Sequence, residues 1–81
     1  MNSYKVMFFA RCPNNKIRIT YHLEIQNKKI VSVEEILEFV DQIAEGLHEE
    51  IADQLFTEFR GHQVLTADHH GVTITTTRGE A

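Results

Sequence analysis

Side chains that could bind a metal gather near the end of the chain. Asp68, His69 and His70 are consecutive, and carboxylate and imidazole groups are ligands that zinc and iron accept. Neighbouring residues in an extended chain point in different directions, so a third ligand has to come from elsewhere, with His22 or His62 as candidates. We weigh a zinc site at Asp68, His69, His70 and His22 against the alternative that these histidines are exposed in a turn.

A nucleophile and a pair of carboxylates are the other candidates for chemistry. Cys12 is the only cysteine, so it forms no internal disulfide and belongs to no multi-cysteine metal site. It precedes Pro13 at an expected turn, but no histidine lies near it in the sequence to activate a thiolate. Glu49 and Glu50 belong to an acidic run that is typical of a solvated helix face. The sequence therefore contains no complete catalytic set.

Length and composition indicate one small domain. The 81 residues are 42% hydrophobic with a net charge of −4, and a chain of this length folds as a single domain, here residues 1–81. The longest apolar run near the N-terminus is Val6 to Ala10, too short for a secretion signal or a membrane span. The single thiol favours a reducing compartment. We expect a cytoplasmic protein with no membrane contact.

Two N-terminal segments alternate in the way that is typical of strands. Residues 4–11 carry apolar groups on both faces, with Met7 and Phe9 together on one of them. Residues 13–15 supply turn chemistry, and residues 16–26 then alternate more regularly. The expected inward residues of this second strand are Ile17, Ile19, Tyr21, Leu23 and Ile25.

The middle of the chain is expected to be helical, with an interruption. Ser32 and Glu35 form a capping box that starts a helix. An unbroken helix to Arg60 would be about 42 Å long, whereas an eleven-residue strand reaches only about 36 Å. We therefore expect a kink or break at Gly46, with Glu49 in the first turn of the next helix. The apolar stripe to be buried is Ile36, Val40, Ile43, Leu47, Ile51, Leu55 and Phe59.

A second hairpin closes the chain. It is expected to comprise residues 63–67, a turn at 68–71 and a strand at 72–78, with Val72, Ile74 and Thr76 facing the core. The predicted fold class is α+β, a two-layer ββ(αα)ββ sandwich in which an antiparallel four-stranded sheet has a kinked or paired helix on one face. A β-grasp fold is the main competitor, and it would make the first and last strands parallel neighbours.

The uncovered face of the sheet is the expected contact surface. Met7 and Phe9 among polar groups resemble an interface patch, and a threonine-rich edge strand offers backbone groups for β-augmentation. The first 31 residues hold six Lys or Arg against one Glu, while the remainder is acidic, so charges could also complement each other between copies. Binding of single-stranded nucleic acid is disfavoured by the net negative charge. The expected interface residues are Met7, Phe9, Lys16, Arg18, Thr73, Thr75 and Thr77.

The order of two strands, two helices and two strands resembles one unit of the tunnelling fold, or T-fold, of dihydroneopterin aldolase, GTP cyclohydrolase and pyruvoyltetrahydropterin synthase. The likest stretch is residues 49–79, EEIADQLFTEFRGHQVLTADHHGVTITTTRG. The resemblance implies units that pair sheet edge to sheet edge into barrels with the helices outside. It also implies a glutamate that anchors a pterin, at Glu49 or Glu50, in a site between subunits near His22 and the 68–71 turn.

The catalytic motifs of that family are not matched. Aldolases have Lys-Pro after the third strand, where this chain has Asp68 and His69. Cyclohydrolases have a histidine and a zinc-binding cysteine, where this chain has His69, His70 and Gly71. The paired zinc histidines of the synthase are not matched either, because this chain has only His22 on its second strand. The leading hypothesis is therefore a non-enzymatic interaction or regulatory module, without a cofactor, that binds itself or another protein through its sheet. The alternative is a T-fold enzyme, or an inactive relative, that binds pterins or purines.

Overall fold

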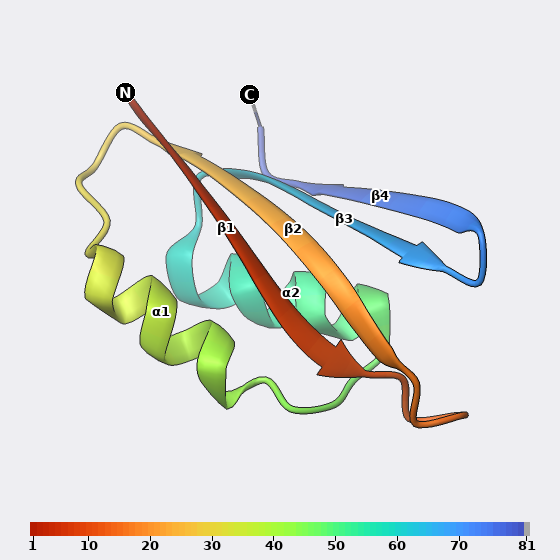
Figure 1. Cartoon of the computed structure of the whole chain (residues 1–81). Coiled ribbons are helices and arrows are strands. Elements are labelled where there is room, and N and C mark those ends of the chain that lie inside the picture. The colour runs from red at the N-terminus through yellow and green to blue at the C-terminus, as the bar shows by residue number, and fades with distance from the viewer. Residues whose placement is uncertain (81) are drawn as a thin grey trace.

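The computed structural model describes residues 1–80 and has its elements in the order ββααββ. They are β1 (Asn2–Arg11), β2 (Arg18–Asn27), α1 (Val33–Gln42), α2 (His48–Phe59), β3 (His62–His69) and β4 (Val72–Arg78). The strands form one sheet in the order β1-β2-β3-β4, with every neighbouring pair antiparallel (Figure 1). The predicted α+β sandwich is confirmed. A β-grasp arrangement is excluded, because β1 and β4 lie at opposite edges.

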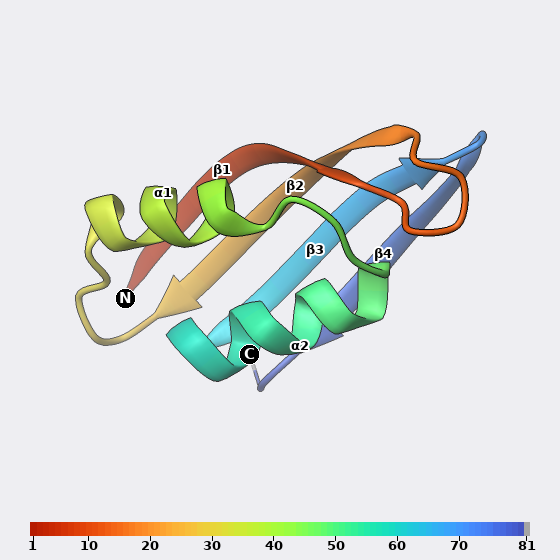
Figure 2. The ribbon, with the colours of Figure 1, turned by 90° about the horizontal axis from the view of Figure 1, so that it is seen from below.

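Alternation along the strands creates the core. On β2 the side chains of Ile19, Tyr21, Leu23 and Ile25 are all buried, and the intervening residues face the other side of the sheet. Both helices lie on this buried side, α1 along the β1 edge and α2 beneath β3 and β4 (Figure 2). Burying one such side chain stabilises the fold by about 1.5–3 kcal/mol, so this single row accounts for a large part of the core.

The helical region is divided where the sequence predicted. Ser32 caps α1 by accepting a hydrogen bond from the backbone N–H of Glu35 at 3.3 Å. Helix α1 ends at Gln42 and α2 begins at His48, so the segment around Gly46 is a true break and not a kink. Within residues 1–80, no helix is long and apolar enough to cross a membrane.

Three residues expected in the core are exposed. Strand β2 begins at Arg18 and not at Lys16, because Lys16 adopts a φ of 63° in the preceding turn, and this leaves Ile17 47% exposed. Leu47 precedes α2 as its N-cap residue and is 43% exposed. Val72 is 62% exposed because the β3–β4 turn projects beyond the point where α2 begins (Figure 1).

The second hairpin is tighter than predicted. Asp68 and His69 belong to β3, and the turn consists of His70 and Gly71 alone. Both have positive φ, 57° and 89°, as a two-residue turn of this hand requires. The short turn keeps His69 in the strand, on the same face as Leu65 and Ala67.

Glycines 61 and 71 allow a matched test of backbone packing. Both have positive φ, but a Cβ on Gly61 would lie 2.4 Å from the carbonyl oxygen of Gln26, whereas one on Gly71 would meet nothing within 4 Å. Gly71→Ala should therefore cost only the left-handed strain, about 1 kcal/mol, and Gly61→Ala roughly 3 kcal/mol or more. Urea denaturation would measure both, and equal losses would contradict the close approach at Gly61.

Candidate functional site

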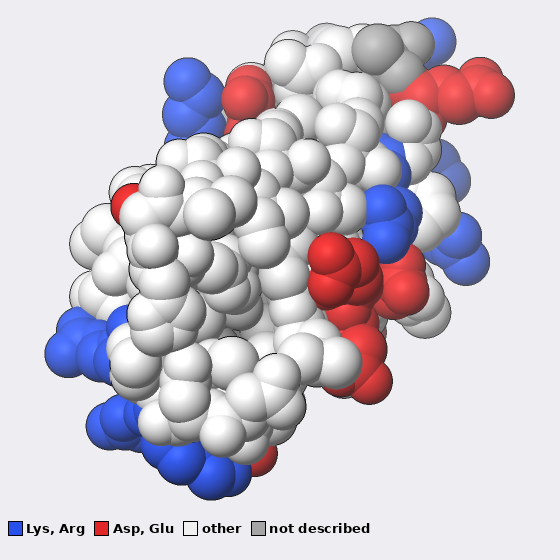
Figure 3. All heavy atoms as spheres, turned by 90° about the vertical axis from the view of Figure 1, so that its right-hand side faces the viewer, with Lys and Arg blue, Asp and Glu red and all other residues white. Residues whose placement is uncertain are grey.

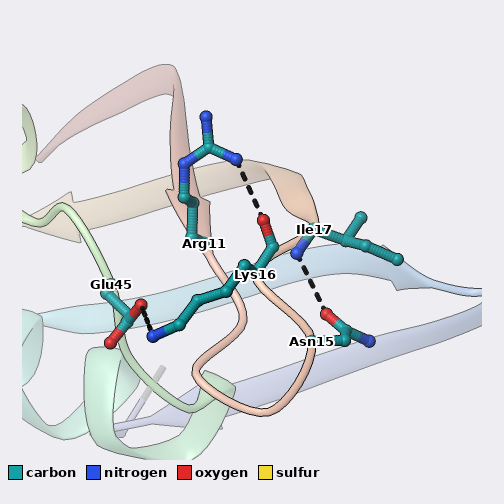
Figure 4. Close-up of polar contacts among 5 residues, drawn as sticks. All are labelled: Arg11, Asn15, Lys16, Ile17 and Glu45. Carbon is teal, nitrogen blue, oxygen red and sulfur yellow. Dashed lines mark hydrogen bonds and ion pairs between the residues drawn. The ribbon is translucent and has the colours of Figure 1, made fainter.

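The linker between the helices is hydrogen-bonded to the end of β1. The backbone N–H of Arg11 donates to the carbonyl of Ala44 at 2.9 Å, and the N–H of Gly46 donates to the carbonyl of Arg11 at 3.2 Å. Close by, the Lys16 ammonium contacts the Glu45 carboxylate at 2.7 Å (Figure 4). We call this set of contacts the clasp. It fixes where α2 starts.

The two hairpin turns meet at the same end of the molecule, which we call the turn end. The side-chain nitrogen of Asn15 lies 2.8 Å from Nε2 of His70, joining the first turn to the second. Figure 3 views the molecule from the side where the β3–β4 turn lies. Uncharged atoms cover most of it, and acidic side chains gather on one flank beside basic ones.

A pair of histidines lies just inside the turn end. Nδ1 of His48, the first residue of α2, is 3.3 Å from Nε2 of His69, and the two rings meet edge to face with centroids 5.3 Å apart. His48 is only 3% exposed because it lies one turn before Ile51 and Ala52 on the buried side of α2. His69 is the last residue of β3 and lies on its helix-facing side, in line with Leu65 and Ala67.

Tyr21 packs against both histidines from the sheet. Its ring stacks on Phe8 at 5.2 Å and lies 5.6 Å from His48 and 6.2 Å from His69 between centroids. Its hydroxyl is buried with no hydrogen-bond partner among residues 1–80. Burial raises the pKa of this hydroxyl, and Cys12 and Glu49 raise it further.

The environment of His48 disfavours its charged form. Burial lowers the pKa of its imidazole most, and the nearby His69 lowers it further, as does the more distant Arg78. Glu49 and the backbone of Leu65 act in the opposite direction without overcoming the burial. Nε2 of His48 is buried and has no hydrogen-bond partner within the described part of the chain. The ring is therefore held neutral at pH 7.

The two candidate glutamates have different roles in the structure. A carboxylate oxygen of Glu50 accepts the backbone N–H of Leu47 at 3.3 Å, so Glu50 caps its own helix. Glu49 is exposed, and no hydrogen bond or ion pair engages it within residues 1–80. Because it lies in the first turn of α2, the helix dipole favours its negative charge. Of the two, Glu49 is the carboxylate that can receive a ligand.

The predicted metal ligands are not brought together. His22 projects from the open face of β2, whereas His69 lies on the helix side. Asp68 accepts the backbone N–H of Gly71 at 2.7 Å, and His70 contacts Asn15. Among residues 1–80 no group of three His, Cys, Asp or Glu side chains is arranged to hold a metal ion. The same separation puts His22 on the opposite face from Glu49 and Glu50.

The open face of the sheet carries the predicted apolar patch. Met7 is 55% and Phe9 43% exposed, and the Arg18 guanidinium lies 3.6 Å from the centre of the Phe9 ring. A shallow hollow of about 450 Å³ beside them is lined by Lys5, Met7, His22, Glu24, Val64 and Thr66, among others. Lys16, by contrast, belongs to the clasp.

Both edges of the sheet offer unpaired backbone groups. The N–H of Cys12 donates to the carbonyl of Ile17, just before β2, so the backbone groups of Arg11 point outward. Alternation then turns those of Ser3, Lys5, Met7 and Phe9 outward too. On β4 the two-residue turn pairs His69 with Val72. The backbone groups of Thr73, Thr75 and Thr77 consequently face away from the sheet.

Sequence reasoning missed the inner cluster of Tyr21, His48 and His69. The signal was present, since His48 precedes Ile51 by three and Leu55 by seven positions, which is the spacing of one helix face. His69 follows Leu65 and Ala67 at the strand period of two. His69 was interpreted as a turn residue because the turn was predicted two residues too wide.

Comparison with known proteins supports the fold. The crystal structure of an archaeosine synthase QueF-Like in the apo form superposes with a TM-score of 0.65 over 95% of this chain and 89% of that chain, at 19% sequence identity. This likeness supports the T-fold resemblance at the level of the fold. No protein-family model matches the sequence, and no curated protein does.

Two tyrosines provide a paired test of the buried hydroxyl. Tyr21→Phe should raise the free energy of unfolding by roughly 1 kcal/mol, because it removes a buried hydroxyl that has no partner. Tyr4→Phe should lower it by about 1 kcal/mol, because the Tyr4 hydroxyl accepts the backbone N–H of Val31 at 3.0 Å. Urea denaturation of both variants is the measurement. A loss of stability in Tyr21→Phe would mean that its hydroxyl has a partner.

Proposed function

We propose that this chain is a self-associating subunit that extends its sheet by pairing β1 of one copy with β4 of the next. The observation that carries this proposal is that the residues with outward backbone groups are also those with side chains on the open face. A neighbour paired at the edge would therefore place its own open-face side chains beside Met7 and Phe9. Edge pairing also fits the T-fold likeness, since such units join edge to edge.

Physical considerations favour association over a free monomer. A long, exposed edge strand with apolar neighbours invites pairing with another chain. Here the edge groups of β4 belong to threonines, which suit strands and carry no charge to oppose the basic β1. A groove of about 250 Å³ between β1 and α1, lined in part by Tyr4, Val6 and Ile36, continues the apolar surface on the helix side.

A second function is favoured by the turn end. We propose that the assembly binds a planar nitrogen heterocycle of the purine or pterin class at Glu49, whose carboxylate can accept two N–H groups from one ligand edge. Glu49 has no competing hydrogen-bond or ion-pair partner in residues 1–80, and it directly follows His48 in the first turn of α2. The solved protein of like fold is named a synthase.

The assembly proposal predicts the effect of charge on the open face. Met7→Glu combined with Phe9→Glu should reduce the mass in solution to that of a monomer while leaving the circular dichroism spectrum unchanged. The matched control is Ile30→Glu, because Ile30 is 89% exposed in the loop before α1 and should tolerate the charge. Sedimentation velocity measures the mass. An unchanged oligomer in the double variant would place the contact elsewhere.

The ligand proposal predicts different outcomes for neighbouring glutamates. Among guanine, guanosine and pterin compounds, at least one should raise the melting temperature of the wild type. Glu49→Gln should weaken its binding about 10- to 100-fold, since a charge-assisted hydrogen bond contributes about 1.5–3 kcal/mol. Glu50→Gln should keep the affinity and lose only part of the helix cap. Calorimetry would decide, and equal losses in both variants would count against Glu49 as the anchor.

A further inference from the structure

Only one proton can lie between the two facing ring nitrogens of His48 and His69. Nδ1 of His48 and Nε2 of His69 are 3.3 Å apart, so one nitrogen donates its proton and the other accepts it through a lone pair. If both rings are protonated, two N–H donors face each other and the hydrogen bond is lost. The two rings belong to α2 and β3, so this bond joins the start of a helix to the sheet.

The groups around the pair act in both directions on a second positive charge, and burial outweighs those that favour it. From β4, Arg78 opposes it, and β2 contributes the buried Tyr21, whose hydroxyl stays neutral. The N-terminus of α2 is itself electropositive, which disfavours a cation at His48. Glu49 on α2 and the backbone of Leu65 on β3 favour the charge, but the exposed Glu49 is screened by solvent. Burial of His48 decides the balance.

We propose that His48 and His69 form a proton-operated latch, in which the pair holds the start of α2 against β3 when it shares one proton and releases it when both rings are charged. Release of His48 would move the first turn of α2, including Glu49, away from the turn end. The proposal of a latch does not rest on the proposed assembly or on the proposed ligand.

The direction of the pH effect follows from linkage. His48 has a lowered pKa in the folded protein, whereas in the unfolded chain it titrates near its ordinary value of about 6.5. The unfolded chain therefore binds more protons once the pH falls below that value. The stabilisation by the latch is complete at higher pH and is lost as the pH falls through about 6.5 toward the lowered pKa.

The test compares unfolding at about pH 7.5 and about pH 5, on either side of the ordinary histidine pKa. The urea midpoint of the wild type should fall on acidification, and His48→Phe should lose at least half of that fall, since phenylalanine packs against Tyr21 without titrating. His69→Gln is the second variant, in case His48→Phe does not fold. His70→Gln and His22→Gln are the controls and should keep the wild-type fall.

A site-resolved measurement separates the latch from general acid destabilisation. Hydrogen exchange of the wild type, corrected for intrinsic rates, should show faster exchange for amides 49–52 than for α1 at the lower pH. EDTA should leave both profiles unchanged. The proposal is overturned if the two pair variants retain the full wild-type fall, if acidification loosens α1 and α2 equally, or if EDTA alone reproduces the release.

Discussion

The two backbone hydrogen bonds between Arg11 and the interhelical linker are the constraint on which the arrangement of this protein depends. They tie the end of the first hairpin to the break between the helices, and the Lys16–Glu45 pair adds to them at the surface. Because the linker is held there, α2 starts beneath β2 and β3. That starting point places His48 against His69 and Tyr21, and it exposes Glu49 beside them.

Contacts between distant segments close the turn end of the molecule, whereas the two edges of the sheet keep unpaired backbone groups. At the turn end, backbone pairing, the Asn15–His70 contact and the histidine pair join segments that are far apart in the sequence. Along the rest of β1 and along β4, the outward backbone groups stay unpaired within residues 1–80. The face opposite the helices carries Met7 and Phe9. The histidine pair therefore lies at the closed end, and the unpaired backbone groups lie along the edges.

Much of the architecture could be predicted from local patterns, and the errors occurred at turns. The alternation around Tyr21, the cap at Ser32 and the break near Gly46 each have a short-range physical cause that is legible in the sequence. Ile17, Leu47 and Val72 have the correct periodicity for burial, but each lies just outside an element or beyond the cover of a helix. Periodicity assigns a face, and it does not say whether anything covers that face.

The sequence by itself determined the α+β class, the order of the elements, the inward rows of the strands and the open face with its apolar patch. These features follow from periodicity and capping, which act over a few residues. Only the tertiary structure decided that His48 meets His69, that His22 lies across the sheet from both, and that Glu50 caps while Glu49 is exposed. Those facts depend on the register between strands and on the point where α2 begins, which involve contacts between residues 21 to 55 positions apart.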